Sequence, residues 1–237
     1  MTPAGGGPRR ALVTGSSRGI GRAIVEALAA SGHAVVGVDI LDQSSVGLAT
    51  AVQADLADPA VPARVVADHG PFDVLVNNAA LFIHKPLPEF SLEDFDRTIA
   101  VNLRAAFLLS QAAAPLMAER GWGRIVNLSS VGARTGGISQ SAVYNATKAA
   151  IISLTKNFAR NYGAAGVTAN AVAPGAVETF MTSHIIPEYR ERYLEQIPVG
   201  RYSEPAEIAD LVDFLVSDRA AYINGATVDI NGGWVMT

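Results

Sequence analysis

The chain has 237 residues, of which 49% are hydrophobic and 17% are charged, and its formal net charge is −4. This composition predicts a large buried core and excludes a disordered protein. The slight acidity and the lack of any basic block argue against nucleic acid as a partner.

The missing residue types narrow the chemistry further. Without cysteine, the chain has no disulfide, no thiolate metal site and no cysteine nucleophile. The histidines are isolated and lack metal-ligand spacing, so no metal site is predicted. No apolar run approaches membrane-spanning length. We therefore expect a cytoplasmic protein without a membrane partner.

Apolar strands alternate with helical segments along the whole chain. Strands are predicted at residues 10–14, 34–39, 51–55, 72–76, 125–128, 167–172 and 226–230, and helices at 23–30, 59–69, 91–120, 142–159 and 205–216. This alternation predicts an α/β protein with one Rossmann-like, doubly wound parallel β-sheet of about seven strands and helices on both faces. Residues 1–9 are expected to form a flexible tail, 10–237 a single domain, and about 180–195 a helical lid.

A glycine turn joins the first strand to the first helix. Gly15, Gly19 and Gly21 occupy it, in a spacing that differs from the usual G-x-G-x-x-G. Glycines allow a tight turn and close approach of a pyrophosphate, and the helix N-terminus offers free N–H groups. A purely structural turn is the alternative interpretation, but strand, glycine turn and helix together are the context of a dinucleotide site.

An acid ends the second strand. Asp39 lies 18 positions after Gly21. A carboxylate at this point can accept hydrogen bonds from the adenosine ribose hydroxyls and repels a 2′-phosphate. A turn or cap residue is the alternative, and the position within the βαβ unit favours the ribose role.

The long helix 91–120 is apolar on more than one face. This breadth predicts burial against the sheet and against a second surface, such as another subunit. Asn102 lies inside it and needs hydrogen-bond partners if it is buried. It is either a structural residue or part of a site.

The stretch from Arg124 to Lys156 carries the reactive groups. A strand delivers Ser129 and Ser130 to its end, and the following helix carries Tyr144 and Lys148 one turn apart on one face. A nearby ammonium would lower the pKa of the phenol, so that Tyr144 could exchange a proton with an alcohol or ketone. A serine hydroxyl could hold the same substrate oxygen. Such a Tyr–Lys pair is also common on ordinary helices.

Taken together, these motifs identify a family resemblance. Residues 10–234 resemble a short-chain dehydrogenase/reductase, through Thr14-Gly15-Ser-Ser-Arg-Gly19-Ile-Gly21, Asn77-Asn78-Ala79-Ala80, Asn102, Ile125-Val-Asn-Leu-Ser-Ser130, Tyr144-Asn-Ala-Thr-Lys148 and Pro174-Gly175-Ala-Val177-Glu-Thr179. Each motif is modest alone, but six in this order are specific to the family.

The resemblance implies a role for each matching residue. Tyr144 would be the general acid/base, Ser130 would bind the substrate oxygen, and Lys148 would hold the nicotinamide ribose and lower the Tyr144 pKa. Asn102 would anchor a water that links Lys148 to solvent. The cofactor would be bound by Gly15, Ser17, Arg18, Gly19, Ile20, Asp39, Asp55, Leu56, Asn78, Tyr144, Lys148, Val177 and Thr179.

The sequence departs from the family pattern in three places. Ala80 replaces a glycine, the gap between Ser130 and Tyr144 is one residue longer than usual, and the short link after Asp39 could leave the adenine pocket open on one side. The longer gap keeps Ser129 as the alternative to Ser130.

The cofactor signals disagree. Arg18 is often met in relatives that use NADP, whereas Asp39 opposes a 2′-phosphate. A like charge in a partly dry site costs more than one flexible surface arginine returns, so NAD is favoured over NADP.

The favoured function is hydride transfer between NAD(H) and a secondary alcohol or ketone. The alternatives are an NADPH-dependent 3-oxoacyl-thioester (acyl carrier protein) reductase, which Asp39 disfavours, and a catalytically silent nucleotide-binding regulator, which the intact Ser130, Tyr144 and Lys148 disfavour. The lid predicts an apolar or cyclic substrate, with Arg190 or Arg192 as an alternative partner for a carboxylate. The resemblance also implies a homotetramer.

Overall fold

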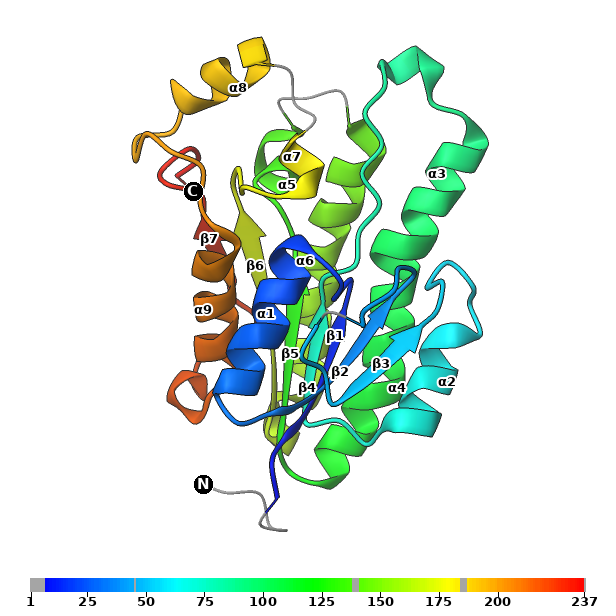
Figure 1. Cartoon of the computed structure of the whole chain (residues 1–237). Coiled ribbons are helices and arrows are strands. Elements are labelled where there is room, and N and C mark those ends of the chain that lie inside the picture. The colour runs from blue at the N-terminus through cyan, green and yellow to red at the C-terminus, as the bar shows by residue number, and fades with distance from the viewer. Residues whose placement is uncertain (1–6, 45, 138–140, 184–186, 237) are drawn as a thin grey trace.

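One parallel sheet organises the molecule. The computed structural model describes residues 7–44, 46–137, 141–183 and 187–236. Among these residues, seven parallel strands form a sheet in the order β3-β2-β1-β4-β5-β6-β7 (Figure 1). The strands are β1 (Arg10–Thr14), β2 (Ala34–Asp39), β3 (Thr50–Gln53), β4 (Val74–Asn77), β5 (Gly123–Leu128), β6 (Val167–Pro174) and β7 (Thr227–Ile230). This arrangement confirms the predicted Rossmann-like sheet.

The strand order reverses between β1 and β4. From β1 the chain builds outward to β3 at one edge, and from β4 it builds outward to β7 at the other. In sheets of this kind, ligands bind outside the carboxyl ends of the strands at the reversal. Gly15 directly follows β1 and Asn78 directly follows β4, so both lie at this point.

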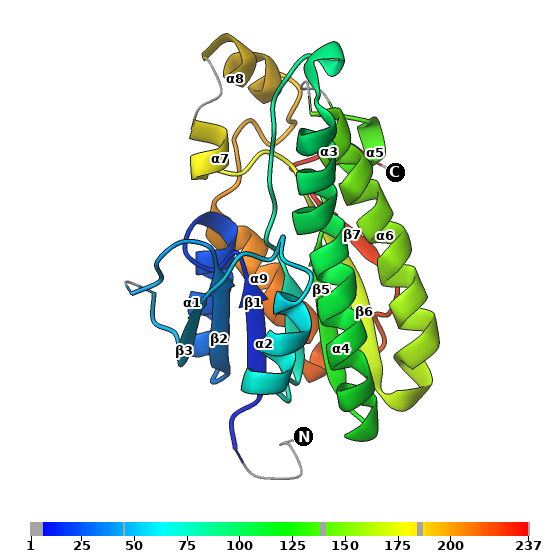
Figure 2. The same cartoon turned by 90° about the vertical axis from the view of Figure 1, so that its right-hand side faces the viewer.

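Helices cover both faces of the sheet. One face carries α1 (Gly19–Ala30) and α9 (Pro205–Val216), which pack against each other (Figure 1). The other carries α2 (Val61–His69), α4 (Ala105–Glu119) and α6 (Ala142–Tyr162) (Figure 2). Each helix buries an apolar stripe, such as Ile24, Val25 and Leu28 of α1. The remaining helical segments are η1 (Leu87–Glu89), α3 (Leu92–Ile99), η2 (Ala100–Arg104), α5 (Gly132–Thr135), η3 (Gly163–Ala165), α7 (Phe180–Ser183), α8 (Pro187–Leu194) and η4 (Asp218–Ala220).

The long helix predicted at 91–120 has three parts. A capping box between Ser91 and Asp94 starts α3, η2 is a π-helical segment, and α4 completes the run. By length and composition, Leu92–Glu119 could cross a membrane, with a mean hydropathy of 1.3, which corrects the prediction that no apolar run reaches such a length. Of its most apolar window, 44% is buried inside the protein.

Several element boundaries differ from the predicted ones by two to four residues, as at the start of α1 and of α2. Helix α2 begins at Val61 rather than Pro59, because the Asp58 carboxylate accepts a hydrogen bond from Ala60 N and forms a separate turn. Residues 1–6 of the predicted tail lie outside the described residues, but Arg9 is held in place. Its guanidinium pairs with Asp218 at 3.0 Å and stacks 3.8 Å over the Trp122 ring.

The top of the molecule gathers the segments that follow the strands. Figures 1 and 2 place α5, α7, α8 and the loop before α3 beyond the carboxyl ends of the strands. The predicted lid therefore consists of α7 and α8 beside this face, and its residues 184–186 lie outside the described part of the chain.

Candidate active site

The glycine turn is packed against the end of β4. The Asn78 amide donates to the carbonyls of Thr14 (2.9 Å) and Gly15 (3.1 Å), and the Thr14 hydroxyl accepts from the backbone of Asn78 and Ala79. A Cβ on Gly21 would lie 1.9 Å from the Gly15 carbonyl oxygen. Gly15 has a φ of 67°, which favours glycine. The turn therefore requires glycine for its own geometry, whatever it binds.

Asp39 joins the second strand to this turn. Its carboxylate accepts a hydrogen bond from Ser17 N at 2.9 Å and another from Leu41 N at 3.0 Å. The Ser17 hydroxyl oxygen is buried without a hydrogen-bond partner in the described structure. An unpaired buried hydroxyl is costly unless a ligand completes it. The turn, the acid and the open hydroxyl fit the ribose and pyrophosphate of a dinucleotide.

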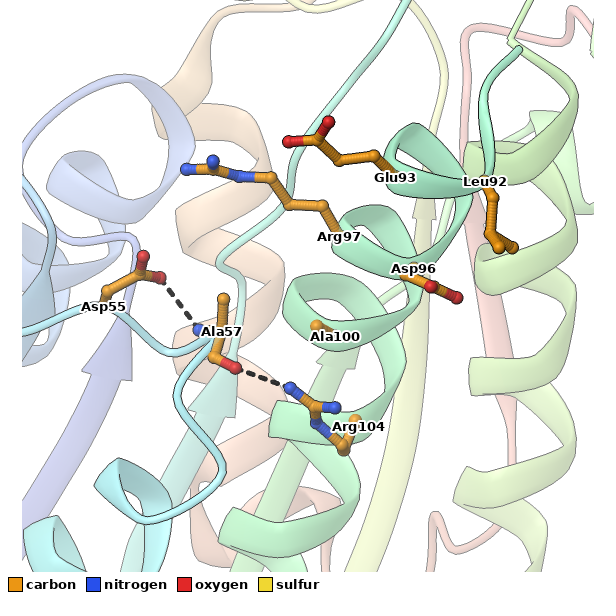
Figure 3. Close-up of a pocket in the computed structure, with 8 residues that line it drawn as sticks. All are labelled: Asp55, Ala57, Leu92, Glu93, Asp96, Arg97, Ala100 and Arg104. Atoms are coloured by element: carbon orange, nitrogen blue, oxygen red, sulfur yellow. Dashed lines mark hydrogen bonds between the residues drawn. The ribbon is translucent and has the colours of Figure 1, made fainter.

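A cavity of about 570 Å³ opens beyond β3 on the adenine side (Figure 3). Asp55 lines it and accepts a hydrogen bond from Ala57 N at 2.8 Å, while Leu56 is buried. Arg104 donates to the Ala57 carbonyl at 2.5 Å. In Figure 3 the Arg97 side chain extends from α3 toward the Asp55 loop. Arg97 is a cation near the adenine end that the sequence analysis did not identify.

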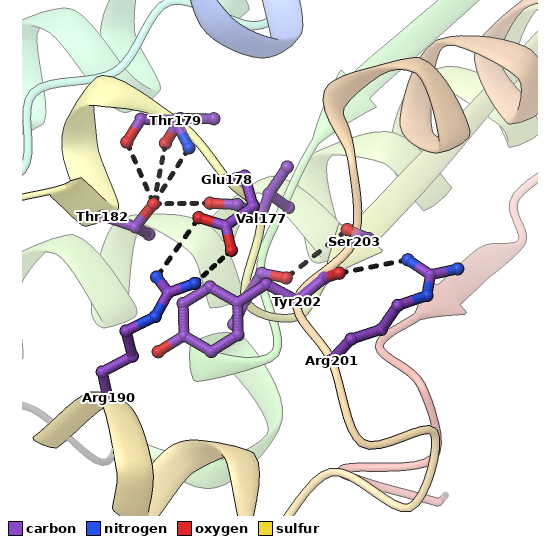
Figure 4. A network of polar contacts seen from close by, with 9 residues as sticks. Val177, Glu178, Thr179, Thr182, Arg190, Arg201, Tyr202 and Ser203 are labelled. Carbon is purple, nitrogen blue, oxygen red and sulfur yellow. Dashed lines mark hydrogen bonds and ion pairs between the residues drawn. The ribbon is translucent and has the colours of Figure 1, made fainter.

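The loop after β6 lies against the glycine turn. A Cβ on Gly19 would lie 3.4 Å from a methyl carbon of Thr179. Val177 is buried and pairs as an isolated β-bridge with Ser203. The Thr182 hydroxyl donates to the Val177 carbonyl at 2.6 Å (Figure 4). The structure thus brings the two predicted nicotinamide-binding residues beside the predicted phosphate site.

An ion pair connects the lid to this loop. Arg190 of α8 forms two hydrogen bonds with the Glu178 carboxylate and stacks 4.3 Å over the Tyr202 ring (Figure 4). Arg190 therefore already has an anionic partner in the protein, and the alternative that it pairs a substrate carboxylate is wrong for this arrangement. Arg192 is exposed.

Arg18 turns toward the lid as well. Its guanidinium carbon lies 4.2 Å above the centre of the Phe180 ring, at the start of α7. Both residues line a second cavity of about 630 Å³ between the glycine turn, the lid and the start of α9. In this arrangement, the arginine that would favour a 2′-phosphate is engaged with an aromatic ring.

The two serines after β5 point to different partners. Ser129 is buried, and its hydroxyl donates to the Lys148 backbone carbonyl at 2.8 Å. The Ser130 hydroxyl accepts from Gly132 N at 3.1 Å and lies beside the Tyr144 phenol, whose pKa it lowers. Geometry therefore favours Ser130 over Ser129 as the serine that shares a substrate oxygen with Tyr144.

Tyr144 and Lys148 lie close together, but the Lys148 ammonium donates its hydrogen bond to a backbone carbonyl. The Lys148 nitrogen is 5.5 Å from the centre of the Tyr144 ring and donates to the Leu128 carbonyl at 2.6 Å. Burial raises the pKa of Tyr144 to about 12, and the contact with Ser130 offsets part of this. Burial lowers the pKa of Lys148 to about 8. The expectation that Lys148 lowers the Tyr144 pKa is not met in this arrangement, because burial raises that pKa and only the contact with Ser130 lowers it.

Asn102 anchors the loop after β4 to the catalytic helix. It is buried in the π-helical segment, a local distortion that often occurs at functional sites. Its amide accepts from Leu81 N at 2.7 Å and donates to the Leu81 carbonyl at 3.0 Å and the Thr147 hydroxyl at 3.2 Å. Thr147 is next to Lys148, so Asn102 links the catalytic helix to this loop.

Sequence reasoning missed two further residues beside Tyr144. Asn145 is buried and donates to the Gly136 carbonyl at 2.9 Å, which fixes the turn after α5. The Phe82 ring packs against the Tyr144 ring, with centroids 5.0 Å apart and planes at 83°. Asn145 could have been noticed as a polar residue on the buried stripe of α6, but no local pattern identifies Phe82.

Comparison with known proteins agrees with this geometry. A family model described as Enoyl-(Acyl carrier protein) reductase matches residues 15–235. The chain is 39% identical to the 3-oxoacyl-(acyl-carrier-protein) reductase FabG of Aquifex aeolicus, over 94% of this chain and 95% of the relative. It is 40% identical to FabG of Escherichia coli, over 95% and 97%.

Solved structures are similar over the whole fold. A protein assigned as an NAD(P)-dependent gluconate 5-dehydrogenase from Beutenbergia cavernae, with bound NADP, superposes with a TM-score of 0.91 at 36% identity over 96% of this chain and 97% of that chain. A 3-oxoacyl (acyl-carrier-protein) reductase from Agrobacterium tumefaciens, with NADP bound, gives 0.89 at 32% identity over 96% and 94%. The sheet, the glycine turn, the Ser–Tyr–Lys cluster and these relatives together show that the chain belongs to the short-chain dehydrogenase/reductase family.

Proposed function

We propose that the protein transfers a hydride between a nicotinamide cofactor and a ketone or secondary alcohol, with Tyr144 as the general acid/base. The observation that carries this proposal is the placement of the Ser130 hydroxyl beside the Tyr144 hydroxyl, whose pKa it lowers, with Lys148 one helical turn away. A carbonyl oxygen placed between these two hydroxyls would accept hydrogen bonds from both. The cluster stands at the carboxyl ends of the strands, beside the predicted dinucleotide site.

The chain's own groups account for the proton in this reaction. When bound, the nicotinamide supplies or accepts the hydride. With a pKa of about 12, Tyr144 is protonated at neutral pH, which is the state needed to donate a proton to a ketone oxygen. Ser130 would hold that oxygen as charge develops on it. Lys148 would hold the cofactor ribose, as the family resemblance implies, and Asn102 would keep the helix and the loop in register.

For the cofactor, we propose a preference for NAD(H). Asp39 supports it, because a carboxylate that already accepts from Ser17 N would repel a 2′-phosphate at the same edge of the turn. The relatives solved with NADP bound favour the opposite choice.

Titration of the wild type and Asp39→Ala with NADH and with NADPH separates the two cofactors. We expect tighter NADH binding that the variant loses. Tighter NADPH binding by the wild type would instead assign the recognition to Arg18.

The second candidate function is reduction of a 3-oxoacyl thioester with NADPH. The 39–40% identity to FabG proteins supports it. Assay of a 3-oxoacyl thioester and of simple ketones, each with both reduced cofactors, distinguishes the candidates. A third reading, a silent nucleotide-binding regulator, predicts that Tyr144→Phe retains the full biological effect.

Oligomerisation belongs to the same proposal. Leu92, Phe95 and Phe107 are exposed apolar side chains on α3 and α4. We propose that this surface is covered in a homotetramer, as the family resemblance implies. Light scattering that finds a monomer would disprove it. The cytoplasmic location stays a prediction.

A further inference from the structure

An aromatic wall stands beside Tyr144. The Phe82 ring meets the Tyr144 ring edge to face, and the His84 ring stacks beside Phe82 with centroids 6.5 Å apart and planes at 20°. Asn102 binds both the N–H and the carbonyl of Leu81, the residue before Phe82. The wall is therefore held by a buried amide rather than by the loop alone.

Four cations around this face are paired with carboxylates. Lys85 pairs with Asp94 at 2.6 Å, Arg134 with Asp229 at 3.3 Å, Arg190 with Glu178, and Arg201 with Glu207 at 2.7 Å. These residues lie on the loop before α3, on α5, on α8 and just before α9. A paired cation contributes little net field to attract an anion.

The one other cation on these segments faces away. Among the described residues of α8, Arg192 lies about 200° around the helix from Arg190, while Tyr193 and Leu194 share the inner side with Arg190. Arg192 is exposed, as expected for the outer face. The sequence of residues 138–140 and 184–186, next to these segments, contains no lysine or arginine.

Apart from Lys148, which donates to the Leu128 carbonyl, and Arg18, which stacks on Phe180, the described cations near this wall are paired or face away. An anionic group on the Phe82 side of the carbonyl would lose its hydration and would meet an aromatic ring rather than a cation, which is costly in a closed site. A flat apolar group, in contrast, can pack against Phe82 while its carbonyl reaches Ser130 and Tyr144. An aromatic pair of this kind adds about 0.5–1.5 kcal/mol beyond its buried area.

We infer that the substrate of this enzyme is an uncharged ketone or secondary alcohol whose apolar, preferably aromatic, group packs against Phe82. This inference rests on the proposed hydride transfer and narrows its substrate class. It separates the chain from relatives that are described as acting on gluconate or on carrier-bound acyl groups.

A matched pair of ketones tests the inference. Acetophenone and 4-acetylbenzoate share the ring and the reacting carbonyl and differ by one carboxylate. We expect kcat/KM for acetophenone to be about 10-fold higher or more, since an unpaired charge is rejected more strongly than a missing methylene. A preference for 4-acetylbenzoate, gluconate or a 3-oxoacyl thioester over the neutral ketones would overturn the substrate class and leave hydride transfer intact.

Variants of Phe82 locate the contact. Phe82→Ala should lower kcat/KM for acetophenone about 10-fold and affect butanone, which has no ring, by less than about 3-fold. Phe82→Leu should be intermediate, and Tyr222→Ala, which removes a fully exposed aromatic outside these segments, should change neither. Saturation-transfer NMR of acetophenone should show direct binding that Phe82→Ala weakens.

The outcomes distinguish a failure of the Phe82 contact from a failure of the proposed hydride transfer. An equal loss with both ketones in Phe82→Ala, or unchanged binding by NMR, would overturn the role of Phe82. A lack of hydride transfer with every compound and both cofactors would disprove the proposed function, and the substrate class with it.

Discussion

The glycine turn and the predicted lid, which line one cavity, are held in different ways. The turn is held by backbone groups and buried amides, such as the bonds from Asn78 to Thr14 and Gly15. The lid is held by side chains, chiefly the pair between Arg190 and Glu178, and it exposes 54% of Phe180. Backbone contacts leave little room for adjustment, whereas side-chain ties can be exchanged. The comparison indicates that the proposed cofactor site is preformed and that the proposed substrate site beside it is adjustable.

The largest expected effect is on the chemical step, through loss of the Tyr144 hydroxyl. Tyr144→Phe removes the proton donor without changing the ring, so kcat should fall about 10³-fold. Thermal unfolding should be nearly unchanged, because the phenol faces the site. Tyr162→Phe, a matched change on the same helix, should retain activity. Retention of activity by Tyr144→Phe would assign the proton to another group.

The next test breaks the backbone geometry of the turn. Gly21→Ala puts a Cβ 1.9 Å from the Gly15 carbonyl, so the turn must shift. We expect the free energy of unfolding to fall by about 3 kcal/mol, together with a loss of cofactor binding. Urea denaturation measures the first and fluorescence titration the second. Gly47→Ala, whose Cβ would meet nothing within 4 Å, is the control; equal losses in both variants would contradict a rigid turn.

A third test uses the buried Lys148. Between pH about 8 and 10.5 the folded protein binds fewer protons at this residue than the unfolded chain, so the free energy of unfolding rises with pH there. Below pH 8 the full penalty applies, about 3 kcal/mol. Lys148→Met should therefore be more stable than the wild type at pH 7, with the difference shrinking by pH 10. Urea denaturation at both pH values measures the free energy of unfolding, with the exposed Lys156→Met as control. If Lys148→Met and Lys156→Met both had the stability of the wild type at each pH, the predicted penalty would be refuted.

The smallest effect is expected at the adjustable side. Glu178→Gln weakens the tie between the lid and the loop of Val177 and Thr179. Both partners are more than a third exposed, so the free energy of unfolding should change by less than about 1 kcal/mol. KM should rise about 3-fold or more, with a smaller change in kcat, because the predicted lid loses its ion pair to the loop. Steady-state kinetics measures KM, and Arg192→Gln, which changes an exposed arginine on the same helix, is the control. An equal rise in KM in both variants would contradict a specific role of the Glu178–Arg190 pair.

Periodicity and short motifs predicted most of the sheet and of the glycine turn. The alternation of strands and helices identified the sheet, and the Ser91–Asp94 capping box marked the start of α3. These features depend on neighbours in sequence, so they can be read locally. Gly15, Asp39 and Asn78 come together because parallel strands end at one edge of the sheet.

The adjustable side and the charge states could not be predicted in this way. The Glu178–Arg190 pair joins residues 12 positions apart through a lid whose fold is not periodic. The bond from Lys148 to the Leu128 carbonyl depends on burial from several elements, and so does the high Tyr144 pKa. Phe82 reaches Tyr144 only because Asn102 holds the preceding residue.

The π-helical segment at Ala100–Arg104 makes the site sensitive to deletions. A π-turn carries a surplus residue relative to an α-helix, and each residue of an α-helix advances it by about 100°. Removal of one residue from this segment would let the helix close regularly with its flanks in place, but it would displace the residues of the π-turn, Asn102 among them. Asn102 would then face away from Leu81 and Thr147, and the aromatic wall would lose its anchor. A shortened homologous chain could thus keep the sheet and the cofactor turn while changing the substrates it accepts.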